Sequence, residues 1–281
     1  MHSQIRAQVA LIAAALGCAL ALTASAAPAA PETPAAVDPT LAALIASPQR
    51  SPPYTARDAA RHPGEELSFF GLRPTMTVVE LWPGGGYWTE ILGPYLAAGG
   101  HYYVALPVPG NQDADDGVAR WNARVASHKE RIGPIRQTVL GKDHYDVAPA
   151  GSADLVVTFR NLHNWMRGGY ADEVLAGCFR ALKPGGILGV EAHRGRTDRP
   201  QDPKAADGYV RQDYAIALAE KAGFELVASS EINANPKDTK DWVDGVWTLP
   251  PTLSQGDKDR DRYLAIGEAD NFVLKFRKPT Q

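Results

Sequence analysis

The chain has 281 residues, of which 44% are hydrophobic and 22% are charged, a composition typical of a globular protein. Its 29 basic and 32 acidic residues are spread along the chain and give a net charge of −3. Because binding to a phosphate backbone requires a basic stripe, this distribution argues against nucleic acid as a partner. The composition does not indicate the oligomeric state.

The N-terminal segment predicts export. Arg6 precedes the apolar run "VALIAAALGCALAL", and "ASA" at residues 24–26 has the small-x-small form of a signal-peptidase site. The run is about 14 residues long, whereas a membrane span needs about 20, so a cleaved signal peptide over residues 1–26 is favoured over an anchor. We therefore expect a periplasmic or secreted protein that meets the membrane only through this peptide. Cleavage would leave Cys178 without a disulfide partner in the chain.

A leader is predicted between the signal peptide and the folded domain. Residues 27–53 are rich in Ala and Pro, which is typical of a flexible segment, with one short helix expected from Pro39 to Ser47. A single domain is expected from residue 54 to residue 281. Its first segment, "TARDAARHPGEELSFFGL", mixes charged and apolar residues at helical spacing, with Thr55 available as the N-cap of one helix beside the first strand.

From residue 75 onward, short apolar runs alternate with helical segments. The expected strands are "TMTVVEL", "HYYVALPV", "IRQTVL", "ADLVVTF" and "GILGVEAH", and the helices between them cover residues 87–99, 115–130 and 168–183. Strands that alternate with helices pair in parallel through right-handed crossovers. The sequence therefore predicts an open, mostly parallel α/β sheet with helices on both faces.

Two further strands, "ELVASSEI" and "NFVLKFRK", follow the helix "YVRQDYAIALAEKAGF" and complete the predicted sheet. Residues 233–270 separate them, which is long for a hairpin loop, so this segment is expected to be an insertion. It contains Trp242 and Trp247. The insertion could fold over the mouth of a pocket, or it could only cover the edge of the sheet.

A glycine loop follows the first strand. The strand ends in Glu80 and then turns through Gly84, Gly85 and Gly86 into a helix, which leaves backbone N–H groups unobstructed by side chains. The loop lies at the carboxyl edge of the sheet, where open α/β folds bind their ligands. It could hold a flat nucleoside, or it could be a plain turn between strand and helix.

Three motifs carry a resemblance to a known family. "VVELWPGGGYWTEIL", "ADLVVTFRNLHNWM" and "LAGCFRALKPGGILGVEAH" stand in the order and spacing of the class I S-adenosylmethionine-dependent methyltransferases, which the chain resembles over residues 65–231. The resemblance implies a Rossmann-like methyltransferase sheet with an antiparallel last strand, and S-adenosylmethionine as the cofactor. By that likeness, the loop lines the methionine end of the cofactor. The candidate cofactor-binding residues are Glu80, Trp82, Gly84, Gly85, Gly86 and Asn161.

A narrower resemblance concerns the segments "FRNLHNW", "GVWTLPPTL" and "GDKDRDRYLAIGE". They are similar to those of a group of exported bacterial proteins known only as predicted methyltransferases, and this group brings no established substrate. The function implied is transfer of a methyl group to an acceptor, a small molecule or an envelope component.

The chain departs from the family pattern at two places. Trp82 stands where the pattern has a glycine, and the second strand ends in "ALP" at residues 105–107, without the acid that accepts hydrogen bonds from the ribose. Each such bond to a charged acceptor contributes about 1.5 to 3 kcal/mol. The departures favour an alternative, a non-catalytic periplasmic protein that binds a small molecule on a methyltransferase fold. A third hypothesis is a nicotinamide-dependent oxidoreductase with Gly84-x-Gly86-x-x-Thr89 as a degenerate dinucleotide loop.

Methyl transfer needs proximity, orientation and a base for an oxygen or nitrogen acceptor. His163 follows the fourth strand and is a candidate base, and Arg160 could bind a carboxylate substrate through its planar fork. The same segment could instead be a hydrogen-bonded turn. Glu191 and His193 end the fifth strand, and with His163 they offer zinc or iron ligands, but their spacing has no metal signature and no metal is predicted.

Overall fold

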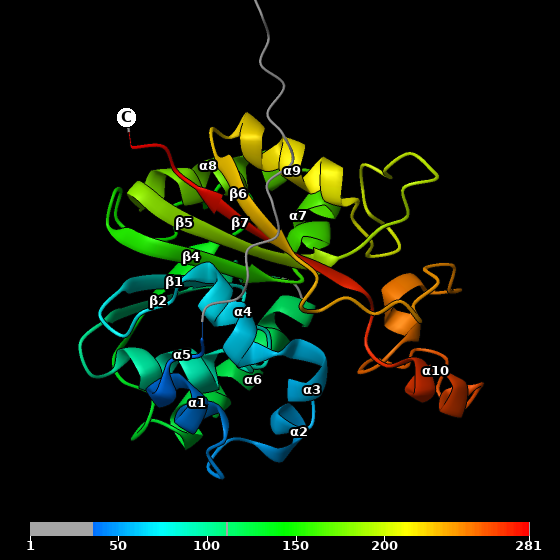
Figure 1. Cartoon of the computed structure of the whole chain (residues 1–281), viewed down its shortest axis with the longest axis horizontal. Coiled ribbons are helices and arrows are strands. Elements are labelled where there is room, and N and C mark those ends of the chain that lie inside the picture. The colour runs from blue at the N-terminus through cyan, green and yellow to red at the C-terminus, as the bar shows by residue number, and fades with distance from the viewer. Residues whose placement is uncertain (1–35, 111, 281) are drawn as a thin grey trace, which may run out of the picture.

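A central sheet organises the computed structural model, which describes residues 36–110 and 112–280 (Figure 1). Within these residues, seven strands form one sheet in the order β3-β2-β1-β4-β5-β7-β6. The strands are β1 Thr77–Leu81, β2 His101–Pro107, β3 Ile135–Leu140, β4 Ala153–Phe159, β5 Leu182–His193, β6 Glu225–Ser230 and β7 Asn271–Arg277. The first five pair in parallel, and β7 runs antiparallel to β5 and β6. The predicted fold class is therefore confirmed.

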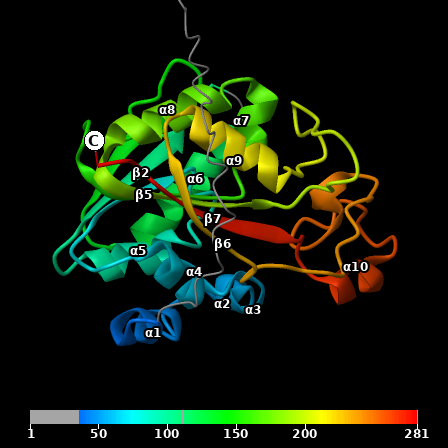
Figure 2. The ribbon, with the colours of Figure 1, turned by 45° about the horizontal axis from the view of Figure 1, so that its top comes forward.

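Helices cover both faces of the sheet (Figures 1 and 2). One face packs against α7 Leu162–Gly168, α8 Ala171–Ala181 and α9 Gln212–Lys221. The other packs against α1 Pro39–Ile45, α4 Pro63–Phe70, α5 Thr89–Leu96 and α6 Gln112–Ser127. Neighbouring residues of a strand face opposite cores, as Val78 and Val79 do, because side chains alternate along a strand. The carboxyl ends of the parallel strands meet at one edge of the sheet, where open α/β folds bind their ligands.

The segment after Tyr54 does not form the single helix that its spacing predicts. It folds as α2 Pro52–Thr55, α3 Asp58–Arg61 and α4, with His62 between the last two at a φ of 39°. Pro63 begins α4 because its ring disfavours a helical residue before it. The predicted N-cap was wrong, since Thr55 ends α2 and its hydroxyl donates to the Pro52 carbonyl at 3.1 Å.

Ordered structure precedes Tyr54. The Asp38 side chain caps α1 by accepting a hydrogen bond from the Leu41 amide at 3.0 Å, and Leu41 is buried in the core beside α5. Arg50 and Ser51 are also buried. The predicted signal peptide, residues 1–26, lies outside the described residues, so export stays a prediction. Among the residues that the structure describes, no helix is long and apolar enough to cross a membrane.

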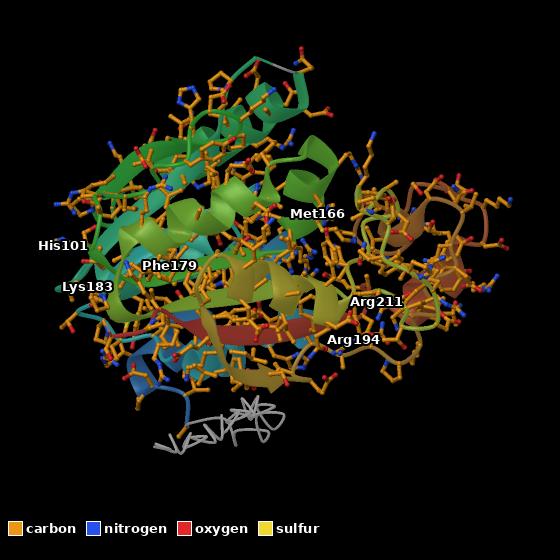
Figure 3. The ribbon with its side chains drawn as sticks, turned by 90° about the horizontal axis from the view of Figure 1, so that it is seen from above. His101, Met166, Phe179, Lys183, Arg194 and Arg211 are labelled. Carbon is orange, nitrogen blue, oxygen red and sulfur yellow. The ribbon has the colours of Figure 1, made fainter. Side chains whose placement is uncertain are left out.

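The insertion between β6 and β7 forms a small apolar cluster of its own. It contains the 3₁₀ turn η1 Gly245–Thr248 and the helix α10 Arg260–Ile266, packed around Leu249 and Tyr263. Both ribbon views place it beside the end of the sheet at which β7 begins (Figures 1 and 2). Seen from above, His101 and Lys183 mark the amino edge of the sheet, while Arg194 lies towards the insertion (Figure 3). The insertion therefore adjoins the carboxyl edge.

Candidate functional site at the carboxyl edge of the sheet

A cavity of about 210 Å³ lies at the carboxyl ends of β1 and β4. The glycine loop after β1, the turn after β4 and the helices α2 and α3 supply its walls. Six predicted site residues line it: Glu80, Trp82, Gly84, Gly85, Arg160 and Asn161. Gly86 and His163 do not. The fold therefore brings most of the predicted residues to one place.

The glycine loop exposes part of its backbone to this cavity. Gly84 has a φ of 57°, and a Cβ atom added there would meet no atom within 4 Å. Gly85 is different, because the Tyr54 hydroxyl donates to its carbonyl oxygen at 2.5 Å and would clash with an added Cβ. The open backbone is thus confined to Gly84, and Tyr54 covers its neighbour.

Trp82 forms the wall of the cavity towards β2 and β3. Its backbone N–H donates to the Ala105 carbonyl at 2.9 Å, and its indole N–H donates to the Leu140 carbonyl at 2.9 Å. The indole also packs edge-on against Trp165, with ring centroids 5.9 Å apart. Among the described residues that line the cavity, none belongs to β2 or β3. The Trp82 side chain therefore separates the cavity from the strand end at which the family has its ribose-binding acid.

The Trp82 backbone is strained. Its φ of 48° lies in the left-handed region, which costs an L-residue with a side chain roughly 1 to 2 kcal/mol. Asn161 helps to hold it there, because its side-chain amide donates to the carbonyls of Leu81 at 3.0 Å and Trp82 at 3.2 Å. The Asn161 amide nitrogen is therefore engaged with the loop backbone.

Glu80 is a fully buried carboxyl group at the base of the loop. Its Oε2 atom accepts hydrogen bonds from the hydroxyls of Thr89, at 3.0 Å, and Tyr102. Its Oε1 atom has no hydrogen-bond partner among the described residues. Burial raises the pKa of Glu80 to about 7, although the two hydroxyls favour the ionised form. Burial therefore makes Glu80 harder to ionise than an ordinary glutamate.

Arg160 is held in a buried network of charges. It has a φ of 63°, its Nε donates to Glu191 at 3.0 Å, and its Nη1 donates to Glu268. Glu268, from the insertion, also accepts two hydrogen bonds from Arg57, at 2.5 and 2.8 Å. These carboxylates raise the pKa of Arg160. The fork predicted to bind a substrate carboxylate is thus already paired with carboxylates of the protein.

Arg57, Arg61 and Glu268 are residues of this region that no sequence motif indicated. Arg57 and Glu268 stand 211 residues apart, so no local pattern connects them. One signal was available, because residues 57 and 61 are four positions apart and share a face of the helix predicted there. A pair of arginines on the face that packs beside a ligand loop indicates an anion site.

His163 lies away from the cavity, within α7. It is buried, and its ring is 5.6 Å from the ring of His193 and 5.7 Å from that of Trp247. Its Nδ1 atom has no hydrogen-bond partner in the described part of the chain. Burial and the nearby Arg167 lower the pKa of His163 to about 4. The imidazole is neutral at neutral pH and is a weak proton acceptor.

Glu191 does not join the two histidines. It accepts hydrogen bonds from Arg160 and from the Asn233 amide, whereas His193 bonds to Asn271 at 2.7 Å. Within residues 36–110 and 112–280, no group of three His, Cys, Asp or Glu side chains could hold a metal ion.

We expect His163→Phe to change the free energy of unfolding at pH 7 by less than about 1 kcal/mol, because the substitution removes a buried nitrogen that has no partner. The matched control is His193→Phe, which breaks the bond to Asn271 and should cost about 1 to 3 kcal/mol. Urea unfolding of both variants measures the difference. Equal destabilisation by the two substitutions would contradict the unpaired state of His163.

A larger hollow of about 350 Å³ lies over residues 195–211. Each of its arginines is already paired with an aspartate: Arg196 with Asp198, Arg199 with Asp207 and Arg211 with Asp213. The parallel strands do not contribute to it. The smaller cavity is therefore the better candidate.

Solved structures to which the chain is similar include S-adenosylmethionine-dependent methyltransferases and a cyclase. An S-adenosylmethionine (SAM)-dependent methyltransferase from Aquifex aeolicus is 15% identical with a TM-score of 0.52, covering 86% of this chain and 98% of its own. The [4+2]-cyclase SpnF is 15% identical with a TM-score of 0.54, covering 79% and 82%. The trans-methyltransferase CalH, in complex with SAH, is 15% identical with a TM-score of 0.50, covering 80% and 58%.

These likenesses concern the fold. The chain has the Rossmann-like fold of the SAM-dependent methyltransferases, and at such identities that is the extent of what the likeness shows. The cyclase demonstrates that the same architecture serves another reaction. Neither a family model nor a curated protein matches the chain.

Proposed function

We propose that the protein is an S-adenosylmethionine-dependent methyltransferase acting on a small-molecule acceptor. The observation that carries the proposal is the position of the cavity, which lies on the bare Gly84 backbone at the carboxyl ends of β1 and β4. This is the place at which open α/β sheets bind their ligands, and solved structures with this fold include S-adenosylmethionine-dependent methyltransferases.

The methionine end of the cofactor fits the residues present. Glu80 lines the cavity and its Oε1 atom has no hydrogen-bond partner among the described residues, so this carboxyl group is the candidate acceptor for an ammonium group. Gly84 leaves room for the chain of the amino acid to approach the backbone. When bound, the cofactor supplies a methyl group on a sulfonium centre, and the protein's part is to orient the acceptor in line with it.

The nucleoside end fits less well. β2 ends in Ala105, Leu106 and Pro107, so it offers no carboxylate to a ribose. Trp82 closes the cavity on that side, and the remaining 210 Å³ is below the 300 to 1,000 Å³ typical of pockets for drug-sized ligands. Binding of the whole cofactor therefore requires the Trp82 side chain to leave the ends of β2 and β3.

Calorimetric titration of the purified protein with S-adenosylmethionine tests this function. We expect weak but saturable binding, because the methionine end is recognised while Trp82 opposes the nucleoside end. The control titration uses Gly84→Val, whose side chain would fill the open space over the loop and impose β-branched strain at a positive φ. An absence of heat with millimolar cofactor would exclude the proposed function.

A further inference from the structure

Arg61 is a buried arginine whose side chain makes no hydrogen bond within the described part of the chain. It ends α3, is 9% exposed and lines the cavity. Its closest carboxylate is that of Glu268, whose Oε2 atom is 3.6 Å from the Arg61 Nε. The guanidinium lies over the Tyr87 ring, 4.5 Å from the centroid. A guanidinium has five N–H donors, so a buried one without an acceptor indicates a partner that is not part of the fold.

Glu268 forms an ion pair with Arg61 at 3.6 Å but no hydrogen bond, and it is shared with two other arginines. Oε1 and Oε2 both accept from Arg57, and Oε2 also accepts from Arg160. Burial and the positive charges of Arg160 and Arg57 lower the pKa of Arg61 to about 10. The arginine cluster, defined as Arg57, Arg61 and Arg160, is therefore short of negative charge at Arg61.

The other buried carboxyl groups nearby do not supply the missing charge. Glu191 accepts hydrogen bonds from Arg160 and from Asn233. Glu66 accepts from Asn233 at 2.7 Å, and burial together with the charge of Glu191 raises its pKa well above the usual range. Burial therefore disfavours the charged form of Glu66. Glu191 and Glu268 are thus hydrogen-bonded to Arg160 and Arg57, and neither is hydrogen-bonded to Arg61 beside the cavity.

The remaining walls of the cavity are aromatic. Trp88 and Phe159 stack with ring centroids 3.9 Å apart, and Tyr87 adjoins them. A cavity of about 150 Å³ in another protein holds benzene, so 210 Å³ suits a molecule of one ring or a short chain. The site therefore combines a guanidinium that has no hydrogen-bond acceptor among the described residues with a small apolar space.

We propose that this cavity binds a small organic monocarboxylate, with the carboxylate on Arg61 and the apolar part against Trp88 and Phe159. The inference does not depend on methyl transfer. The carboxylate belongs either to a separate acid or to the amino-acid end of a bound cofactor, and the recognition chemistry at Arg61 is the same in both cases.

Calorimetry with two pairs of probes tests the site. Benzoate is compared with benzamide, which has the same shape without the charge, and S-adenosylhomocysteine is compared with 5′-methylthioadenosine, which lacks the amino acid. Each probe is titrated into the wild type, Arg61→Gln and Arg61→Lys. Arg180→Gln is the control, because Arg180 is exposed and pairs with Asp146 at the surface.

We expect wild-type protein to bind benzoate about 30-fold more tightly than benzamide, and Arg61→Gln to abolish the preference. Arg61→Lys should keep only part of it, since an ammonium cannot form the planar fork. If the cofactor is the source of the carboxylate, Arg61→Gln also weakens S-adenosylhomocysteine and leaves 5′-methylthioadenosine unchanged. If a separate acid is the source, only benzoate responds.

Thermal unfolding gives an independent readout. Without ligand, Arg61→Gln should melt at the same or a higher temperature than the wild type, because it removes a buried charge that lacks an acceptor. Benzoate should raise the melting temperature of the wild type and not that of the variant. Equal affinity of the wild type for benzoate and benzamide, together with no loss of S-adenosylhomocysteine affinity in Arg61→Gln, would overturn the proposal. The benzoate result stands even if S-adenosylmethionine does not bind.

Discussion

Trp82→Gly is expected to bind S-adenosylmethionine more than about tenfold more tightly than the wild type. The indole separates the cavity from the ends of β2 and β3, so its removal opens the space that a nucleoside needs. Glycine also takes the φ of 48° at that position without strain. Calorimetric titration of both proteins under the same conditions measures the gain.

The control for this prediction is Trp82→Phe, which keeps an aromatic ring and the strained backbone. Its affinity for the cofactor should stay close to that of the wild type. If the phenylalanine and glycine variants bind equally well, the indole does not restrict the site. If the glycine variant binds no better than the wild type, the nucleoside does not lie towards β2 and β3.

Trp82→Gly should also destabilise the fold. It removes the hydrogen bond to Leu140 and the packing against Trp165, and truncation of a tryptophan commonly costs 3 to 5 kcal/mol. Relief of the left-handed backbone returns roughly 1 to 2 kcal/mol. We therefore expect a net loss of about 1 to 4 kcal/mol in the free energy of unfolding by urea, and a smaller loss when the cofactor is present.

Glu80→Gln is expected to become more stable than the wild type as the pH rises. The pKa of Glu80 is about 7 in the folded protein and 4.5 ordinarily, so the folded state holds this proton more tightly than the unfolded state. The stabilisation is fully present below pH 4.5 and is lost as the pH rises through 7. A shift of this size corresponds to about 3 kcal/mol. Glutamine stays neutral at every pH, so the variant does not lose this stabilisation as the pH rises.

The measurement is the free energy of unfolding of both proteins at pH 4.5 and pH 8. The difference between them should change by about 3 kcal/mol in favour of Glu80→Gln. Glu225→Gln is the control, because Glu225 is exposed and pairs with Arg277 at the surface. A difference that does not change with pH would mean that Glu80 is ionised in the folded protein throughout this range.

Local patterns were sufficient for much of the fold. Each predicted strand is present, including the antiparallel pair at the edge, because alternation along a strand is a property of neighbouring residues. The helix predicted after Tyr54 failed at His62 and Pro63, where a single proline outweighs the spacing of the apolar residues around it.

The orientation of side chains at the site required the structure. The sequence indicated Arg160 as a free fork, whereas Glu268 and Glu191 pair with it in the folded protein. Likewise, Trp82 stands where the methyltransferase pattern has a glycine, but the sequence did not indicate that its indole would reach the Leu140 carbonyl at the end of β3. Contacts of this kind join segments that lie far apart along the chain.

By itself, the sequence determined the strands, their succession along the chain and the bare glycine backbone at the carboxyl edge, because these follow from periodicity and turn residues within short segments. Only the tertiary structure decided that Arg57 and Arg160 are hydrogen-bonded to carboxylates while the Arg61 side chain has no hydrogen-bond acceptor among the described residues. The reason is that Arg57, Arg61 and Glu268 meet across more than two hundred residues of chain, and only packing of the insertion against α3 sets the distances between them.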